Sequence, residues 1–283
     1  MKLEKFLKKN RNIKSLIIAT PDLNGIWRGK RTPSSQISKI EKGNFRMPIS
    51  IQNLDIWGKD IEESKWVFKT GDADGKCFWT GRMPLNISWL NKPSALIPVS
   101  LFLENNSPFS GDPRFLLNNI KNKFKEKKLN CVLGIEIEFY LIKSKKDLKY
   151  SDKDNLYSIS EMEDLDHYFN EIQLACELQD IVIESTISEC GPGQFEIVLK
   201  HQNDIVKVAD DIMFLKYIIK GLAEKNGFRA SFMPKPFGEK AGSGMHAHCS
   251  IIDNNDNNIF DNGKSDGSKL LKNAIAGLLN TMA

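Results

Sequence analysis

The sequence has no long hydrophobic segment, no dense basic block and no CxxC motif. The apolar run near its N-terminus, around residues 16–19, is too short for a signal sequence or a membrane span. The 40 Lys and Arg residues are interspersed with 36 Asp and Glu residues, which leaves a net charge of only +4. We therefore expect a cytoplasmic protein that does not bind a membrane and does not have nucleic acid as its first partner.

The cysteines are odd in number and widely spaced along the chain. This pattern argues against a disulfide framework and against a zinc cluster. The interpretation that remains is a set of reduced thiols buried in the core. The five residues are Cys77, Cys131, Cys176, Cys190 and Cys249.

The chain of 283 residues is 41% hydrophobic, which allows one large domain or two smaller ones. In its first part, short apolar runs alternate with turn signals such as those at 70–75, and this predicts a small strand-rich domain. A polar stretch follows at 104–112, where Asp112 before proline is typical of a helix start. We place the domain boundary in this stretch, with domains at 1–108 and 109–283.

The second part mixes helical and strand patterns, so the predicted fold class is α+β. Apolar residues at helical spacing follow Pro113, and the segment CVLGIEIEFYLI then switches to a period of two. Further helical patterns cover 164–178 and 204–225. Further strand patterns cover 181–188, 194–200, 228–233 and 244–252.

Two pairs of glutamates stand out in these strands. Glu136 and Glu138 lie on one face of the strand expected for GIEIEFYL, about 6–7 Å apart. Glu189 and Glu196 bracket CGPGQF, whose glycines and proline predict a turn that would bring both to one end of a hairpin. Each pair alone is more readily explained as polar surface or loop, and only their occurrence together favours a site.

A third element carries two of the four histidines. In GSGMHAHCSII, His246, His248 and Ser250 alternate with other residues and share one strand face. Four carboxylates with one or two imidazoles would make an oxygen-rich site, which suits Mg²⁺ or Mn²⁺ and disfavours zinc. So much charge implies more than one cation, as in enzymes that hold ATP for phosphoryl transfer.

The three segments, in this order, resemble the glutamine synthetase family. GIEIEFYL is similar to its Glu-x-Glu strand, ECGPGQFE to its paired-glutamate element, and FMPKPFGEKAGSGMHAHCSI to its longest signature. DLNGIWRGKR, GDADG and GDPRFLL extend the resemblance over nearly the whole chain. The implied fold is an N-terminal β-grasp-like domain followed by a catalytic domain, an antiparallel-sheet half-barrel with helices.

The resemblance also implies roles for single residues. The first metal ion would be bound by Glu138, Glu189 and Glu196. The second, near the ATP phosphates, would be bound by Glu136 and His246.

Substrates would contact other residues of the same segments. Gly242 matches a glycine against the substrate glutamate, and His248 and Ser250 match positions on the nucleotide side. Asp55, in LDIWGKD, corresponds to an acid that the N-terminal domain lends to a neighbouring subunit's active site.

The implied reaction is ATP-dependent amide formation between the γ-carboxylate of glutamate and ammonia or an amine, through γ-glutamyl phosphate. Ala241 stands where many ammonia-using members carry asparagine, and GIWRGKR is closer to the branch that uses polyamines or other amines. A ring of identical subunits, with active sites formed between them, is a further implication.

The family's later arginines, its flap acid and a further glutamate have no counterpart in this chain, whose last residues predict an amphipathic helix. We therefore expect a C-terminally truncated catalytic domain. The alternative is a catalytically incomplete relative that acts as a structural or regulatory subunit.

Overall fold

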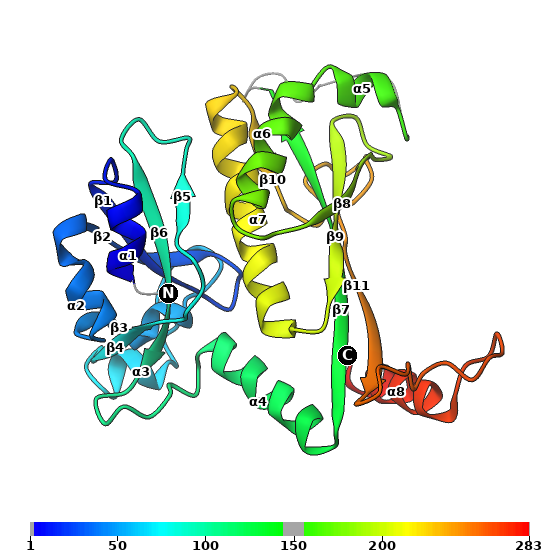
Figure 1. Cartoon of the computed structure of the whole chain (residues 1–283), viewed down its shortest axis with the longest axis horizontal. Coiled ribbons are helices and arrows are strands. Elements are labelled where there is room, and N and C mark those ends of the chain that lie inside the picture. The colour runs from blue at the N-terminus through cyan, green and yellow to red at the C-terminus, as the bar shows by residue number, and fades with distance from the viewer. Residues whose placement is uncertain (1–2, 144–155, 283) are drawn as a thin grey trace. The chain divides into compact units, whose positions relative to one another are not determined.

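The computed structural model describes residues 3–143 and 156–282, and the chain divides into two compact units. Unit 1 comprises Met1–Asn118 and Met213–Lys225, and unit 2 comprises Asn119–Ile212 and Asn226–Ala283. Figure 1 shows the course of the chain. The domain boundary at 108/109 remains a prediction, since the two units divide inside helices α4 (Pro113–Glu126) and α7 (Ile205–Lys225).

Unit 1 contains a six-stranded sheet with short helices, as the strand-rich pattern predicts. Its strands run in the order β2-β1-β6-β4-β3, with β5 also paired to β6. β1 and β6 are parallel, and the other pairs are antiparallel. The elements are α1 (Leu3–Lys9), β1 (Ser15–Pro21), β2 (Trp27–Pro33), η1 (Ser34–Gln36), α2 (Ile37–Glu41), β3 (Phe45–Pro48), η2 (Ile49–Gln52), α3 (Lys65–Phe68), β4 (Asp74–Trp79), β5 (Leu85–Ile87) and β6 (Ser94–Phe102).

The core of unit 1 lies against one face of this sheet, and alternate residues of the strands contribute to it. Leu16 and Ile18 of β1 and Ile97 of β6 are fully buried, together with Ile40 of α2. Such a mixed sheet, with parallel central strands and a helix packed against it, agrees with the β-grasp-like expectation.

Unit 2 is organised around an antiparallel sheet of five strands. Its order is β10-β7-β9-β8, and β11 pairs with β7 along the part of that strand that β10 leaves free. The elements are β7 (Leu129–Ile142), α5 (Ile159–Glu163), α6 (Asp166–Glu177), β8 (Ile183–Ser188), β9 (Gln194–Gln202), β10 (Arg229–Ser231), β11 (Met245–Asp253) and α8 (Lys269–Thr281).

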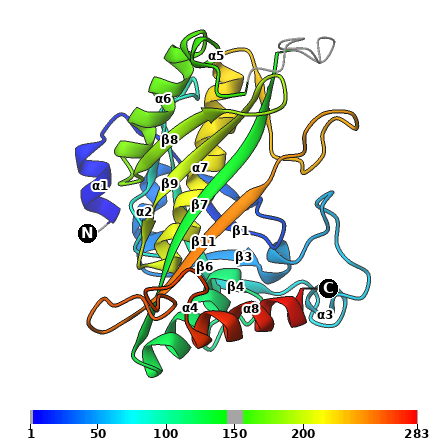
Figure 2. The same cartoon turned by 90° about the vertical axis from the view of Figure 1, so that its right-hand side faces the viewer.

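The two faces of this sheet differ because side chains alternate along each strand. One face is apolar: Phe139 and Phe195 lie 6.2 Å apart, and Phe169 of α6 packs on Phe195 at 5.2 Å. The helix α6 lies on this side of the sheet (Figure 1). Figure 2 looks onto the opposite face. The paired residues Glu138 and Glu196 alternate with Phe139 and Phe195 along β7 and β9, and they therefore belong to that face.

The cysteine prediction is only partly right. Cys77 and Cys176 are buried, but Cys131 is half-buried, and Cys190 and Cys249 are exposed. Cys190 lies in a turn and Cys249 lies in the outer strand β11. In both positions an apolar sequence context is not enough to bury a side chain in the core. Among the described residues, no helix has the length and apolar character needed to cross a membrane.

Candidate metal centre

The register of three strands brings the candidate residues of unit 2 onto one face. Glu138 of β7 is paired with Glu196 of β9, and Glu136 of β7 is paired with His246 of β11. Directly paired residues of antiparallel strands point to the same side of a sheet, with Cβ atoms about 4.5–5.5 Å apart. The hairpin expected around CGPGQF exists, with β8 and β9 as its arms.

One compact group among the described residues joins side chains that the family resemblance assigns to different metals. Glu136, Glu196 and His246 each offer a ligand atom, and these atoms lie within 4.8 Å of one another. Two carboxylates and one imidazole form an oxygen-rich donor set, which suits Mg²⁺ or Mn²⁺. The residues therefore fit the implied ion, and Glu196, predicted for the first metal, lies beside the two residues predicted for the second.

Glu138 is held by neighbours on both sides. The side-chain amide of Gln194 donates to Glu138 Oε2 at 2.8 Å, and the backbone N–H of Gly244 donates to the same oxygen at 3.1 Å. The alternating pattern places Gln194 on this face, but it does not reveal the bond to Glu138. That contact depends on the pairing of β7 with β9, for which the sequence carries no direct signal.

Glu136 lies between two histidines of β11. Its carboxylate is 3.1 Å from His246 Nδ1 and 3.0 Å from His248 Nε2. The hydrogen bond with His248, reinforced by that with His246, lowers the pKa of Glu136. The bond to Glu136 in turn raises the pKa of His246, because it stabilises the imidazolium form. His248, predicted on the nucleotide side, thus contacts a predicted metal ligand directly.

The other two glutamates have the opposite shift. Partial burial raises the pKa of Glu189 and of Glu196, and the neighbouring carboxylates add to the effect, among them Glu136 and Glu138. Carboxylates crowded in this way repel one another. A divalent cation would remove that repulsion, which is an independent reason why these residues fit a metal ion.

The turn that carries Glu189 fits closely against β7. A Cβ atom at Gly191 would lie 2.0 Å from the hydroxyl oxygen of Tyr140, so only glycine fits there. The buried carboxylate of Glu161 accepts from the hydroxyl of Ser188 at 2.7 Å and from the backbone of Gly193 at 3.3 Å. Glu161 was not predicted from the sequence, because it acts on this turn from a separate helix, α5.

The Gly242 segment is attached to the same face. Gln194 donates to the carbonyl of Gly242 at 2.9 Å, and the hydroxyl of Tyr140 donates to the carbonyl of Ala241 at 2.7 Å. Ser250 lies further along β11 and is half-buried. The roles predicted for Gly242 and Ser250 remain predictions.

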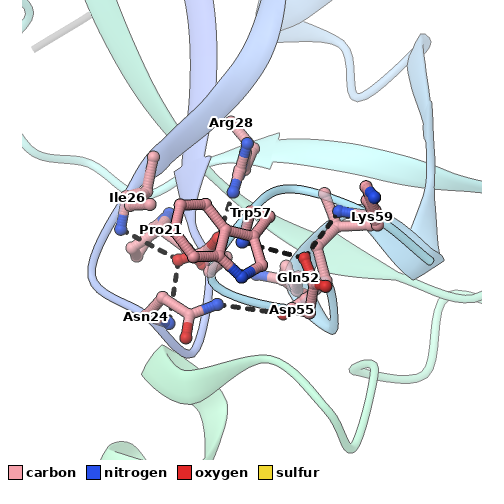
Figure 3. Close-up of polar contacts among 10 residues, drawn as sticks. Pro21, Asn24, Ile26, Arg28, Gln52, Asp55, Trp57 and Lys59 are labelled. Atoms are coloured by element: carbon pink, nitrogen blue, oxygen red, sulfur yellow. Dashed lines mark hydrogen bonds and ion pairs between the residues drawn. The ribbon is translucent and has the colours of Figure 1, made fainter. Parts of the chain in front are cut away.

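Asp55 belongs to unit 1, where it organises a surface loop (Figure 3). Its Oδ1 accepts hydrogen bonds from the backbone N–H groups of Trp57 and Lys59, at 2.9 and 2.8 Å. Asn24 donates to the carbonyl of Leu54 from the neighbouring turn. This loop is therefore well defined by its own hydrogen bonds, and the role predicted for Asp55 at a neighbouring subunit's site remains a prediction.

The chain is similar to known proteins over nearly its whole length. The chain is 31% identical to gamma-glutamylputrescine synthetase PuuA of Escherichia coli (strain K12) and 29% identical to glutamate--isopropylamine ligase of Pseudomonas sp.. Each alignment covers 99% of this chain but only 62% and 63% of the relative. The chain thus spans less than two thirds of the length of these relatives.

Solved structures and a family model agree with these relatives. The chain superposes with a TM-score of 0.82 on a structure described as "GmaS/ADP complex-Conformation 1", at 22% identity, covering 99% of this chain and 63% of the other. A second structure, "Apo GmaS without ligand", gives the same TM-score at 23% identity, covering 99% and 64%. The family model "Glutamine synthetase, catalytic domain" matches residues 110–283. The chain therefore belongs to the glutamine synthetase family.

Proposed function

We propose that this chain, which spans less than two thirds of the length of its relatives, belongs to an ATP-dependent ligase that joins the γ-carboxylate of glutamate to ammonia or an amine. The observation that carries the proposal is the convergence of Glu136, Glu196 and His246, whose ligand atoms lie within 4.8 Å of one another. Family membership supports the same reaction class, because relatives include gamma-glutamylputrescine synthetase, glutamate--isopropylamine ligase and glutamine synthetase.

Some of the site residues would bind metal ions, and others would contact the substrates. Glu138, Glu189 and Glu196 would hold a first Mg²⁺ or Mn²⁺, and Glu136 with His246 would hold a second. Bound divalent ions supply charge neutralisation for the phosphates of ATP. Gln194 and the backbone N–H of Gly244 would keep the Glu138 carboxylate in position, because both donate to it.

The reaction would proceed in two displacements. A γ-carboxylate oxygen of glutamate attacks the terminal phosphorus of ATP, forming γ-glutamyl phosphate and releasing ADP. The nitrogen of ammonia or an amine then attacks the acyl carbon, loses a proton and expels phosphate. Gly242 would lie beside glutamate, with His248 and Ser250 on the nucleotide side.

The proposal extends to assembly and location. Asp55 would act at the site of a neighbouring subunit, in a cytoplasmic ring of identical chains. The loop around Asp55 supports this role, since its hydrogen bonds already define the direction of the carboxylate (Figure 3).

Phosphate release from ATP tests the reaction class on the longest form of the protein that the coding sequence supplies. We expect release that requires glutamate together with one of a panel of ammonia, isopropylamine and putrescine. The amine that works identifies the nucleophile. Release that is independent of glutamate would refute the proposed ligase.

Calorimetric titration with Mn²⁺ tests the site separately from turnover. Glu138→Ala should weaken Mn²⁺ binding by about tenfold or more, since it removes a charged ligand. The matched control is Glu184→Ala on β8, an exposed glutamate outside the cluster. Equal binding by wild type and Glu138→Ala would refute Glu138 as a ligand.

A further inference from the structure

Two cysteines face each other across the seam between β7 and β11. The sulfur atoms of Cys131 and Cys249 lie 3.3 Å apart, although the residues are separated by 118 positions in sequence. Cys131 is paired with Ile251, and Cys249 is two residues before that partner, so the contact is diagonal across the two strands. The strands already hold the sulfurs near each other, and the sulfurs must approach by a further ~1.3 Å to reach the S–S bond length of about 2.0 Å.

The pair lies on the face of the sheet opposite the carboxylates. Cys249 alternates with His248 along β11, and Cys131 shares the parity of Ile135 and Ile137 on β7. Chemistry at the two sulfurs would therefore leave the metal-binding face unobstructed. Any effect on that face would pass through the backbone of the two strands.

The two sulfurs also differ in a way that favours exchange chemistry. Cys249 is exposed and Cys131 is half-buried, so Cys249 is the more accessible of the two residues. The hydrogen bond with the Cys131 side chain lowers the pKa of Cys249 to about 7. An accessible thiol that is partly ionised near neutral pH is the usual attacking group in thiol–disulfide exchange.

We propose that Cys131 and Cys249 form a reversible disulfide site that reacts with small-molecule disulfides and joins β11 covalently to β7. The Cys249 thiolate attacks one sulfur of the reagent, forming a mixed disulfide and releasing one thiolate. Cys131 then loses its proton and attacks the Cys249 sulfur, which releases the second thiolate. Two protein thiols are oxidised, and one reagent disulfide is reduced to two thiols.

The structural consequence would fall on β11. Among the described residues, the named strand paired with β11 is β7. A covalent link at this seam would restrict separation of the strands, and it would close a loop of more than a hundred residues, which raises stability mainly by restricting the unfolded chain. The strand that carries His246 and His248 would then open less often.

The test uses the full chain treated with oxidised glutathione. We expect two free thiols to disappear, the mass to fall by two hydrogens, and peptide mapping to find a link between Cys131 and Cys249. Amide hydrogen exchange in β11 should slow by about tenfold, with little change in β8. Reduction with dithiothreitol should reverse all three changes.

Single variants make the assignment specific. Cys249→Ser and Cys131→Ser should each prevent the intramolecular link, and Cys190→Ser, which removes the other exposed cysteine, should leave it unchanged. Thiol titration in denaturant confirms that every remaining cysteine is present. The proposal is wrong if both thiols stay free after wild-type protein is incubated with oxidised glutathione, or if the link found instead involves Cys190.

Discussion

Gln194 contacts three separate parts of the site with one buried side chain. Its Oε1 accepts from the backbone of Gly191 at 2.9 Å, and its Nε2 donates to Glu138 and to the carbonyl of Gly242. The residue is only 1% exposed, so water cannot readily replace these partners. The orientation of the Glu138 carboxylate therefore depends on a residue that is not itself a candidate ligand.

Gln194→Ala should lower the affinity for Mn²⁺ by about tenfold while the ligands stay in place, because partners that orient metal ligands commonly have effects of this size. Calorimetric titration provides the measurement. Gln173→Ala is the matched control, since the Gln173 amide donates to Glu177 on the exposed side of α6. If both variants bind Mn²⁺ like wild type, Gln194 does not position Glu138.

Gly191→Ala should destabilise the chain by about 1–3 kcal/mol, because the new methyl group would collide with the ring of Tyr140. Urea unfolding of the variant measures the change. At Gly238 the added Cβ would meet no heavy atom within 4 Å apart from the residue itself and its two neighbours in the chain, so Gly238→Ala is the control and should stay near wild type. Equal losses for the two variants would contradict the close approach at Gly191.

The sheet face on which a side chain lies could be predicted where residues alternate along a strand. That rule placed Glu136 with Glu138, and His246 with His248, on common faces. It could not predict which strands pair or in what register, so the contacts of Glu136 with both histidines were not foreseen. Glu161 was missed because it reaches its turn from another element.

A single carboxylate, that of Asp204, caps the N-terminus of helix α7. Asp204 Oδ1 accepts from the backbone N–H groups of Val206 and Lys207, and from the ammonium group of Lys121 at 2.7 Å. Burial opposes ionisation of Asp204, but these hydrogen bonds outweigh it and lower its pKa. The residue is thus both an N-cap and one half of an ion pair.

Asp204→Ala should destabilise the chain by about 1 kcal/mol, because it removes the cap. Asp204→Asn keeps an acceptor oxygen and should lose less. Since the folded-state pKa lies below the ordinary value of 3.8, the charge contributes its full stability above that pH and loses it as the pH falls further. Urea unfolding across this range should show wild type and Asp204→Asn converging at low pH; a constant difference would contradict the ion pair.

Helix starts and long strands were the elements that local sequence predicted best. Asp112 caps α4 through bonds from Arg114 and Phe115, as the Asp-Pro signal indicates. The strand expected at 228–233 is shorter, with β10 limited to Arg229–Ser231, because it pairs only with the last residues of β7. Its length is set by that partner and not by its own composition.

Metal binding should stabilise the folded state of the chain. At an Mn²⁺ concentration about 100 times the dissociation constant, the free energy of unfolding should rise by about 2.7 kcal/mol. Thermal unfolding with and without EDTA measures the shift. Glu136→Ala should abolish most of it, whereas Glu184→Ala should retain it. A shift of the same size in both variants would place the ion elsewhere.

The two unlike faces of β7 and β11 have a consequence for folding. If β11 slipped by a single residue against β7, its side chains would exchange faces: Ala247 would meet Glu136, and His246 would turn toward the apolar side. Cys249 would then point away from Cys131. A crosslink between these cysteines would thus indicate that the two strands are paired in the correct register, with the two histidines on the same face as the carboxylates.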